Sequence, residues 1–419
     1  MSDLFKELKK YNYWDGQKID HGFRRGFYLE KLLGYLDNRL VKVLVGQRRS
    51  GKSYILRQII DRLITRGINR KNIFYFNKEL VEFEGVDDYK KLHSLLDAYR
   101  KEYKPKGKVY LFFDEIQEIE KWEKLVNSLS QNYKEQYEIF ITGSNSNMLS
   151  GELATYLSGR YVSFEILPFS FDEYAQFLSL EKDKKSFTKY LQTGGLPEMF
   201  QLQKEEARRH YVSSLKDTII LKDIVRRYNI KDVALLESIF KFLSDNIGCL
   251  TSINNIVGFL NSHKYKTNIE TVANYINYLA QTYLIYEAER YDIRGKELLA
   301  RNKKYYLNDL SFISYLTSGF DIGPGKLLEN IVYLHYRRLG YKVFVGKIYN
   351  EEIDFIVEND QQKMYVQVAY LLTDKKTIER EYKSLERIND NYKKIVISMD
   401  EVRFKERNGI EHVSIFDLL

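Results

Sequence analysis

The stretch VLVGQRRSGKS, residues 43–53, decides the fold of the first part of the chain. It fits the pattern G-x-x-x-x-G-K-[ST], in which backbone N–H groups curl around phosphates, the lysine reaches the β- and γ-phosphates, and the hydroxyl reaches Mg²⁺. An apolar run over 39–45 predicts a strand before the loop, and the apolar spacing of 52–67 predicts a helix after it. The stretch therefore predicts a nucleotide site, with candidate cofactor-binding residues Gly46, Gln47, Arg48, Arg49, Ser50, Gly51, Lys52, Ser53 and Tyr54.

A second apolar run delivers two acids. KVYLFFDEIQEI, residues 108–119, reads as a buried parallel strand that ends in Asp114 and Glu115. Asp114 is a candidate ligand of Mg²⁺ together with Ser53, and Glu115 is the candidate catalytic residue that orients or deprotonates the attacking water. The alternative, a surface strand that ends in solvated acids, does not explain the run of apolar residues immediately before Asp114. The paired acids also favour activation of water over a small-molecule kinase.

A third strand, YEIFITGSNS at 137–146, ends in polar side chains, and Ser144 and Asn145 are candidates to contact the γ-phosphate or the water. A short helix is predicted within 148–158, followed by Arg160. An arginine at that helix end is placed to act as a finger on nucleotide held by a neighbouring subunit. A polar loop after the strand and a salt-bridged surface arginine are the alternatives.

Composition sets the broad class. The 419 residues contain 44% hydrophobic residues, and the net charge of +8 permits a polyanionic partner without requiring one. Cys249 is the single cysteine, which excludes an internal disulfide and favours a reducing cytoplasm. Uncharged apolar runs do not approach the length of a membrane helix. The six histidines lack the spacing of zinc ligands, so a zinc site is not expected.

These motifs together resemble the AAA+ superfamily of ATPases. More closely, the segments GQRRSGKS, FFDEIQ, ITGSNS, LSGRY, ILPFSFDEY, TGGLPE and LKDIVRRY resemble a prokaryotic family described as predicted AAA+ ATPases with a C-terminal domain of unknown function. The resemblance runs from about Arg24 to the end of the chain. It implies nucleotide and magnesium roles for Lys52, Ser53, Asp114 and Glu115, and it places Arg160 at the arginine-finger position.

The chain beyond the predicted ATPase core begins with helical segments. Pro168 ends the last strand, and Gly194, Gly195 and Pro197 interrupt a helical pattern and predict a hinge or tight turn. The resemblance assigns this region to a small helical lid. A further helix carries Arg226 and Arg227, which either sense nucleotide or belong to a charged exposed face.

Residues 232–318 resemble a winged helix-turn-helix domain. Amphipathic helices, two of them with the N-caps Ser252 and Asn268, precede two strands around a basic loop. The recognition helix, 270–281, offers only Asn274, Asn277 and Gln281 to a DNA groove. Phosphate contacts are then expected from Lys264, Lys266, Arg294, Lys296, Arg301, Lys303 and Lys304. Packing of this module against other domains or subunits is an equal alternative to DNA binding.

The last segment resembles the PD-(D/E)XK nuclease fold. Glu329 on a helix, Asp354 after a strand and Gln367 in the next strand form a candidate degenerate metal site. The resemblance places an acid at Gln367 and a lysine at Ala369, and both departures remove catalytic groups. Lys375 or Lys376 could reach in from the next helix. A nuclease-like fold without strong nuclease activity is the prediction.

The predicted organisation is an N-terminal extension (1–22), an α/β P-loop NTPase core of AAA+ type with a parallel sheet and helices on both faces (23–168), a helical lid (169–231), a winged-helix domain (232–318) and an α/β nuclease-like domain (319–419). The expected activity is Mg²⁺-dependent ATP hydrolysis coupled to conformational change, in a nucleic-acid-associated motor or switch. An ATP-regulated DNA nuclease and a signalling or scaffold ATPase with only protein partners are the alternatives. ATP and Mg²⁺ are the expected cofactors and double-stranded DNA a candidate partner. A cytoplasmic homo-oligomer without a membrane partner is expected.

Overall fold

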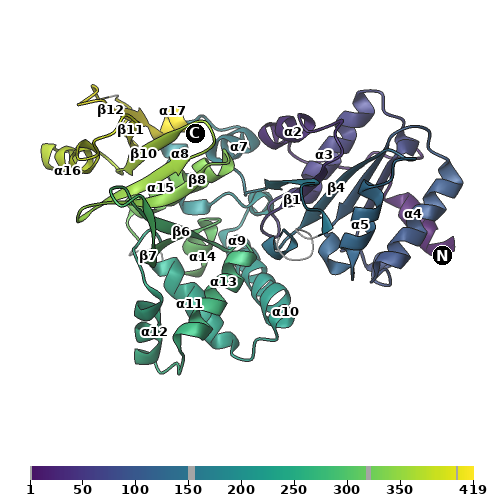
Figure 1. Ribbon diagram of the computed structural model, residues 1–419, viewed down its shortest axis with the longest axis horizontal. Helices are drawn as coiled ribbons and strands as arrows, with labels where there is room; N and C mark the ends of the chain where they lie inside the picture. The colour runs from purple at the N-terminus through teal and green to yellow at the C-terminus, as the bar shows by residue number, and fades with distance from the viewer. Residues whose placement is uncertain (1, 150–155, 318–321, 403) are drawn as a thin grey trace. The chain divides into compact units, whose positions relative to one another are not determined.

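The chain divides into two compact units. The computed structural model describes residues 2–149, 156–317, 322–402 and 404–419, and the division falls between Ile166 and Leu167 (Figure 1). This position lies next to Pro168, where the sequence predicts the end of the ATPase core. Each unit is built around its own sheet.

The first unit alternates strands and helices. Its strands are β1 (Val41–Val45), β2 (Ile73–Asn77), β3 (Val109–Asp114), β4 (Tyr137–Gly143) and β5 (Tyr161–Glu165). Its described helices are α1 (Ser2–Lys10), α2 (Gly26–Leu33), α3 (Lys52–Thr65), α4 (Tyr89–Tyr103) and α5 (Trp122–Ser130), with short 3₁₀ turns η1 (Arg70–Asn72), η2 (Val81–Phe83), η3 (Ile116–Glu118) and η4 (Ser146–Met148). The short helix predicted within 148–158 falls mostly on 150–155, outside the described residues.

The strands of this unit form a 5-stranded sheet in the order β2-β3-β4-β1-β5, and every neighbouring pair is parallel. β4 lies between β1 and β3. The carboxyl ends of these three strands therefore meet at one edge, where ligands bind in sheets of this kind. The arrangement confirms the predicted parallel-sheet α/β P-loop NTPase fold.

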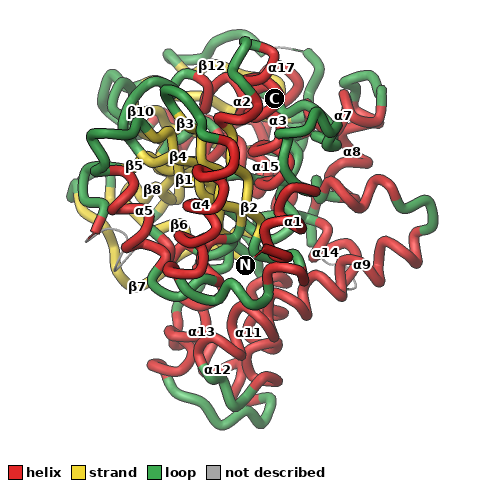
Figure 2. Tube along the Cα trace, turned by 90° about the vertical axis from the view of Figure 1, so that its right-hand side faces the viewer, coloured by secondary structure: helices red, strands yellow, loops and turns green. Residues whose placement is uncertain are grey.

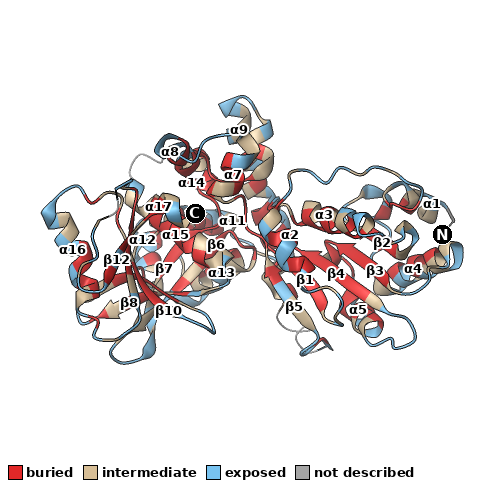
Figure 3. Cartoon of the chain, turned by 90° about the horizontal axis from the view of Figure 1, so that it is seen from above, coloured by how far each residue is buried: buried red, intermediate tan, exposed pale blue. Residues whose placement is uncertain are grey.

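Helices cover both faces of this sheet. Because successive side chains of a strand point to opposite faces, Tyr75 and Phe74 of β2 belong to different cores. Tyr75 joins the buried cluster that contains residues of α2 and α3, among them Leu32 and Ile59. Phe74 instead packs against Tyr99 of α4, with ring centroids 5.2 Å apart. Figure 3 shows the strands buried between helices whose outer faces are exposed.

The N-terminal segment protects the edge strand β2. The Asn12 amide accepts a hydrogen bond from the Tyr75 N–H (2.8 Å) and donates one to the Tyr75 carbonyl (2.9 Å). The Trp14 indole N–H donates to the carbonyl of Ile73 (2.5 Å). These side chains satisfy backbone groups that an uncovered edge would offer to another strand. The segment predicted as an extension is thus integrated into the first unit.

The second unit begins with helices and continues into a large sheet. The helices are α7 (Phe171–Leu178), α8 (Lys184–Thr193), α9 (Glu205–Thr218), α10 (Arg226–Tyr228), α11 (Val233–Asp245), α12 (Ile253–Ser262), α13 (Ile269–Gln281), α14 (Ser311–Leu316), α15 (Pro324–Arg338), α16 (Lys375–Glu386) and α17 (Ile415–Leu418), with a 3₁₀ turn η5 (Pro197–Gln201) and a π-helical segment η6 (Ile219–Val225). The strands are β6 (Ile285–Asp292), β7 (Glu297–Leu307), β8 (Lys342–Ile348), β9 (Glu351–Glu358), β10 (Lys363–Val368), β11 (Lys393–Ser398) and β12 (Ile410–Ser414).

One 7-stranded sheet joins the strands of the second unit, in the order β12-β11-β10-β9-β8-β6-β7. The predicted two-strand wing is present as the antiparallel pair β6–β7. β6 also pairs in parallel with β8, with Tyr291 opposite Gly346. The sheet therefore continues across residue 318, where the sequence analysis places a domain boundary.

Helices α11, α12 and α13 lie together before this hairpin (Figure 2). As predicted, Ser252 and Asn268 cap α12 and α13, because their side chains accept hydrogen bonds from the N–H groups of Asn255 and Thr271. Throughout the described part of the chain, no helix combines the length and apolar character needed to cross a membrane.

Candidate functional site

The loop after β1 is shaped by two glycines. Gly46 has φ 145°, and a Cβ placed there would lie 2.3 Å from the Ile166 carbonyl oxygen, so a side chain does not fit. Gly51 has φ 97° and stands at the N-cap of α3. The loop thus turns sharply onto a helix N-terminus, whose free N–H groups and dipole favour a bound phosphate.

Lys52 is the first residue of α3, and its side chain folds back over the loop. It is buried, with 4% exposure. Its ammonium donates to the carbonyls of Gly46 (2.9 Å) and Gln47 (3.0 Å), and it lies 3.4 Å from a carboxylate oxygen of Glu115. A buried positive charge at this loop is suited to compensate the charge of a bound polyphosphate.

Asp114, the last residue of β3, is fully buried and held through both carboxylate oxygens. Oδ1 accepts from the Thr142 hydroxyl (2.5 Å) and Oδ2 accepts from the Tyr75 hydroxyl (2.8 Å). The Ser53 hydroxyl bonds to the same carboxylate. Burial and the neighbouring Glu115 carboxylate raise the pKa of Asp114. A serine hydroxyl beside a carboxylate is an oxygen donor set of the kind that Mg²⁺ prefers, so Ser53 and Asp114 fit this ion.

Glu115 adopts a left-handed backbone conformation (φ 52°) that turns its side chain toward Lys52. Its N–H donates to the Thr142 hydroxyl oxygen (2.8 Å), and its carboxylate accepts from the Gln117 amide (2.5 Å). Burial by itself would raise the pKa of Glu115, but the Lys52 ammonium and the Arg48 guanidinium outweigh it, so the pKa lies below its ordinary value. An ionised carboxylate in a buried site can accept a proton from water.

The end of β4 adds a polar side chain with spare hydrogen-bonding capacity. Asn145 is 1% exposed, and its Oδ1 accepts from the Asn147 N–H (2.8 Å). Its Nδ2 has no hydrogen-bond partner among the described residues. A buried amide donor left unpaired is costly, and a ligand is one way to satisfy it. The Ser144 hydroxyl instead accepts from the Gln117 amide at 3.4 Å.

The remaining predicted residues of the loop lie around this core. Gln47 and Ser50 are buried, Arg48 forms an ion pair with Glu79, and Arg49 has φ 66°. Tyr54 faces the N-terminal segment, since a Cβ at Gly22 would lie 2.7 Å from its ring.

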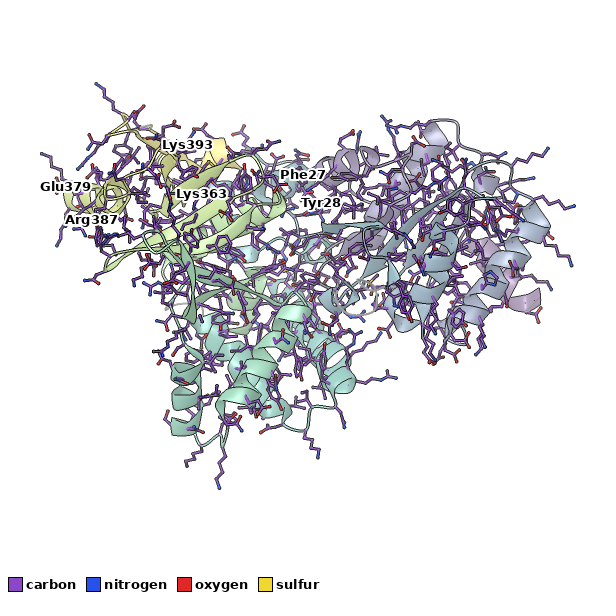
Figure 4. All side chains as sticks on the ribbon, in the orientation of Figure 1. Phe27, Tyr28, Lys363, Glu379, Arg387 and Lys393 are labelled. Carbon is purple, nitrogen blue, oxygen red and sulfur yellow. The ribbon has the colours of Figure 1, made fainter. Side chains whose placement is uncertain are left out.

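The structure adds residues that the motifs did not indicate. Arg25, buried at 2% exposure, donates to the Ser50 carbonyl (2.8 Å), and its guanidinium lies 4.6 Å from the ring centroid of Tyr28. Figure 4 labels Tyr28 on α2. Thr142 and Tyr75 hold Asp114. Arg25 and Tyr75 are far from the motifs in sequence. Thr142 lies within the quoted strand ITGSNS, where its hydroxyl was the available signal.

Arg160 lies at the opposite edge of the sheet. It precedes β5, and its carbonyl accepts a hydrogen bond from the N–H of Val41, the first residue of β1 (2.8 Å). The phosphate-binding loop follows the last residue of β1. Arg160 is exposed, and its guanidinium donates to the Asn127 side chain (3.2 Å).

In the second unit, the predicted residues Glu329, Asp354 and Gln367 line one cleft of about 660 Å³. Asp354 lies within β9, not after a strand as predicted. Its Oδ2 accepts from the Val368 N–H (2.8 Å), and its own N–H donates to the Gln367 amide oxygen (3.3 Å). Lys376 and Glu379 of α16 also line the cleft, and Figure 4 labels Glu379 on this helix.

Lys304 occupies the centre of this cluster. Its ammonium lies 2.8 Å from a Glu329 oxygen, 2.6 Å from Glu352 and 3.6 Å from Asp354. Burial would lower the pKa of Lys304, but these carboxylates outweigh it and raise the pKa. Burial and the Glu329 carboxylate raise the pKa of Asp354 above its ordinary value. In the described ranges, no group of three or more His, Cys, Asp or Glu side chains is arranged to hold a metal ion.

This burial corrects the expectation that Lys304 contacts DNA phosphate. The adjacent Lys303 is half-buried and pairs with Glu287 at 2.5 Å. On α13, Asn274 and Asn277 are exposed, whereas Gln281 accepts a hydrogen bond from the Tyr228 hydroxyl. Exposed cations of the hairpin are Arg294, Lys296 and Arg301, and Lys264 and Lys266 are exposed between α12 and α13.

Two family models match parts of the chain. The family described as "AAA domain" matches residues 38–175, and "Domain of unknown function (DUF8612)" matches residues 184–321. An uncharacterized protein of Haemophilus influenzae is 37% identical over 396 residues, which cover 94% of this chain and 97% of that protein. An uncharacterized protein of Methanocaldococcus jannaschii is 28% identical, covering 90% of this chain and 85% of that protein.

Among solved structures, a Walker-type ATPase of Pyrococcus abyssi has a TM-score of 0.42 and 16% identity, covering 69% of this chain and 94% of that chain. The ORC1 protein of Aeropyrum pernix in complex with DNA has a TM-score of 0.33 and 13% identity, covering 68% of this chain and 89% of that chain. The chain belongs to the same family as the Haemophilus influenzae protein, and it carries an AAA domain of the P-loop ATPase type followed by a domain of unknown function.

Proposed function

We propose that the first unit is a Mg²⁺-dependent ATP hydrolase. The observation that carries this proposal is the meeting of Lys52, Asp114 and Glu115 at the carboxyl edge of one parallel sheet, with Asp114 bonded to Ser53 and Glu115 close to Lys52. A buried cation, an oxygen ligand set and an ionised carboxylate are the groups that hydrolysis of a nucleoside triphosphate requires.

The roles of the side chains follow from their positions. Lys52 and the N–H groups at the start of α3 compensate phosphate charge. Ser53 and Asp114 would hold Mg²⁺, which would supply positive charge to the phosphates. Glu115 accepts a proton from the attacking water. The unpaired Nδ2 of Asn145 supplies a hydrogen bond to the γ-phosphate or to that water.

The second unit is proposed to link this activity to nucleic acid as a motor or switch. Helices α12 and α13 followed by the β6–β7 hairpin give the element order of a winged helix-turn-helix. Arg294, Lys296 and Arg301 are exposed on the hairpin, where they would contact phosphates. Because α13 carries no arginine or lysine, the interaction would depend little on base sequence.

Two alternatives make different predictions. An ATP-regulated nuclease requires metal-dependent cleavage that Asp354→Ala abolishes. A signalling or scaffold ATPase with protein partners hydrolyses ATP but shows no salt-sensitive affinity for DNA. Two observations disfavour the nuclease alternative. Lys304 is buried among the carboxylates, and the chain has Gln367 and Ala369 where the nuclease resemblance places an acid and a lysine.

Steady-state release of phosphate from ATP tests the proposal. Lys52→Ala is expected to abolish tight ATP binding or turnover, because it removes the charge that compensates the phosphates. Glu115→Gln is expected to keep binding and lose hydrolysis, because it changes only the group that activates water. Lys90→Met, at an exposed position of α4, is the control. Lys42 is unsuitable because it forms a buried ion pair with Glu138. Equal turnover in all of these proteins would refute the ATPase.

A further inference from the structure

The carboxylate cluster of the second unit is arranged around a cation supplied by the chain itself. Lys304 comes from β7, Glu329 from α15, and Glu352 and Asp354 from β9. The Lys304 side chain is 3% exposed, and its ammonium has all three carboxylates within 4 Å. The oxygens of Glu329 and Glu352 lie within hydrogen-bond distance of the ammonium, and the Asp354 oxygen lies at 3.6 Å.

Two of the acids around Lys304, Glu329 and Asp354, are fixed by further hydrogen bonds. The Tyr306 hydroxyl donates to Glu329 Oε1 (2.6 Å), the same oxygen that Lys304 contacts. The Val368 N–H holds Asp354, and Gln367 bridges from the Asp354 N–H to a carboxylate oxygen of Glu381, to which its amide donates at 3.0 Å. Glu329 and Asp354 are therefore kept facing inward, whereas Glu352, with 32% side-chain exposure, is held among the described residues only by Lys304. Buried carboxylates that face one another are strongly unfavourable unless a positive charge lies between them.

An ammonium and a divalent ion exclude one another from this position. Carboxylate oxygens bind Mg²⁺ at about 2.1 Å and Ca²⁺ at about 2.4 Å, and they surround the ion on several sides. Here the inward space is filled by Nζ of Lys304, with oxygens at 2.6–3.6 Å. The chain has Ala369 where the nuclease resemblance places a lysine. A lysine instead reaches the acids from a different strand, β7. The ammonium of this residue, Lys304, lies between the carboxylates, where an ion would lie.

We propose that Lys304 is the built-in cation of this cluster and occupies the position at which Glu329, Glu352 and Asp354 would otherwise hold a divalent metal ion. The second unit then contains a latent metal site that its own chain keeps closed. This proposal does not depend on the ATPase activity of the first unit. The charge of Lys304 explains how the acids can lie close together without a metal ion between them.

Binding of Mn²⁺ to the full chain without nucleotide tests this directly. All proteins carry Asp114→Asn, which removes the metal ligand of the first unit. The Lys304 parent is expected to show no Mn²⁺ site that depends on Asp354. Lys304→Met, which keeps the length of the side chain and removes its charge, is expected to gain one Mn²⁺ site per chain. Adding Asp354→Asn should abolish this gain.

Lys303→Met is the matched control, because it removes the adjacent lysine that pairs with Glu287 and lies outside the cluster. It is expected to gain no Mn²⁺ site. If Lys304→Met is unstable, its thermal unfolding is measured with and without Mn²⁺. Stabilisation by Mn²⁺ that Asp354→Asn abolishes supports the proposal. The proposal is overturned if a folded Lys304→Met protein has no Mn²⁺ site, or if an unstable Lys304→Met protein is not stabilised by millimolar Mn²⁺. An Asp354-dependent Mn²⁺ site in the parent would also overturn it.

Discussion

At the scale of single residues, Thr142 connects the two acids of the ATPase site. Its hydroxyl donates to the Asp114 carboxylate (2.5 Å) and accepts from the Glu115 N–H (2.8 Å). One side chain of β4 thereby fixes both the proposed metal ligand and the backbone of the proposed base. Because β4 lies between β1 and β3, no other strand could supply this contact to β3 from the same side.

Replacing Thr142 therefore has a specific expected effect. Thr142→Val keeps the shape but removes both hydrogen bonds, so Asp114 and Glu115 lose their alignment. Displacement of a reacting group by about 1 Å can cost about 100-fold in rate, and we expect a fall in kcat of that order with little change in ATP affinity. Thr142→Ser retains the hydroxyl and should restore most of kcat. An inactive Thr142→Ser protein that folds normally would argue against this positioning role.

The sequence predicted the residues of this site that belong to local motifs. Gly46, Gly51 and Lys52 lie within seven consecutive residues, so their pattern is visible without knowledge of the fold. Arg25, Tyr75 and Lys304 were missed, or assigned another role, because their partners lie 25 to 39 residues away and are reached only through tertiary packing. From the sequence alone, Lys304 is expected to be a basic residue of an exposed loop that contacts DNA phosphate.

At the scale of elements, capping residues predicted helix starts well, whereas the pairing of strands that lie far apart in the sequence was not predictable. Ser252 and Asn268 cap their helices through contacts three residues away, which the sequence displays directly. The pairing of β6 with β8 joins residues more than fifty positions apart, such as Tyr291 and Gly346. Such a contact depends on the whole unit, and the hairpin alone gives no sign of it.

The turn after α8 is an element tied to a distant carboxylate. Gly195 N–H donates to Asp309 Oδ2 (2.7 Å), and Ser311 N–H donates to Oδ1 (2.9 Å). A Cβ at Gly194 would lie 2.1 Å from Asp309. The predicted hinge or tight turn at this glycine pair is therefore a packed turn. Burial raises the pKa of Asp309 to about 6 from an ordinary value of 3.8.

This pKa gives a sign for the dependence of stability on pH. The folded protein holds the Asp309 proton up to about pH 6, whereas the unfolded chain releases it near pH 3.8, so this group stabilises the fold less as the pH rises between these values. The free energy of unfolding of the parent, minus that of Asp309→Asn, should increase by up to about 3 kcal/mol from pH 7 to pH 4. Thermal unfolding of both proteins across this range measures the difference. A difference that decreases on acidification would contradict the assignment.

The position of Arg160 leads to a prediction about subunits. Arg160 contacts the first residue of β1, and the phosphate-binding loop follows the fifth, so about 16 Å of strand separates them. Within one subunit Arg160 does not reach the γ-phosphate. Arg160→Ala should bind ATP normally and lose about 10³-fold in kcat, and mixing it with Glu115→Gln should restore some turnover through interfaces with one intact site. No recovery on mixing, together with turnover that is unchanged by dilution far below micromolar concentration, would assign Arg160 a role within its own chain.

At the scale of the whole molecule, the proposed link between ATP and nucleic acid depends on charge distributed over the second unit. The protein should bind double-stranded DNA with an affinity that falls steeply as the salt concentration rises, because each phosphate contact releases counterions. Arg294, Lys296 and Arg301, changed together to Gln, should lower the slope of log affinity against log salt by up to about 3. Gln at Lys90, Lys101 and Lys106, exposed cations of the first unit, is the control. An equal slope in both triple variants would place the DNA contact elsewhere or exclude it.

The central claim is that the buried residues of the first unit hydrolyse ATP through Glu115. The most direct test identifies the nucleotide that remains on the protein after incubation with ATP and Mg²⁺. The parent should carry ADP, Lys52→Ala should carry little nucleotide, and Glu115→Gln should retain unhydrolysed ATP, because it binds the nucleotide but cannot activate water. Recovery of ADP from Glu115→Gln as rapidly as from the parent, or full retention of ATP by Lys52→Ala, would contradict this account.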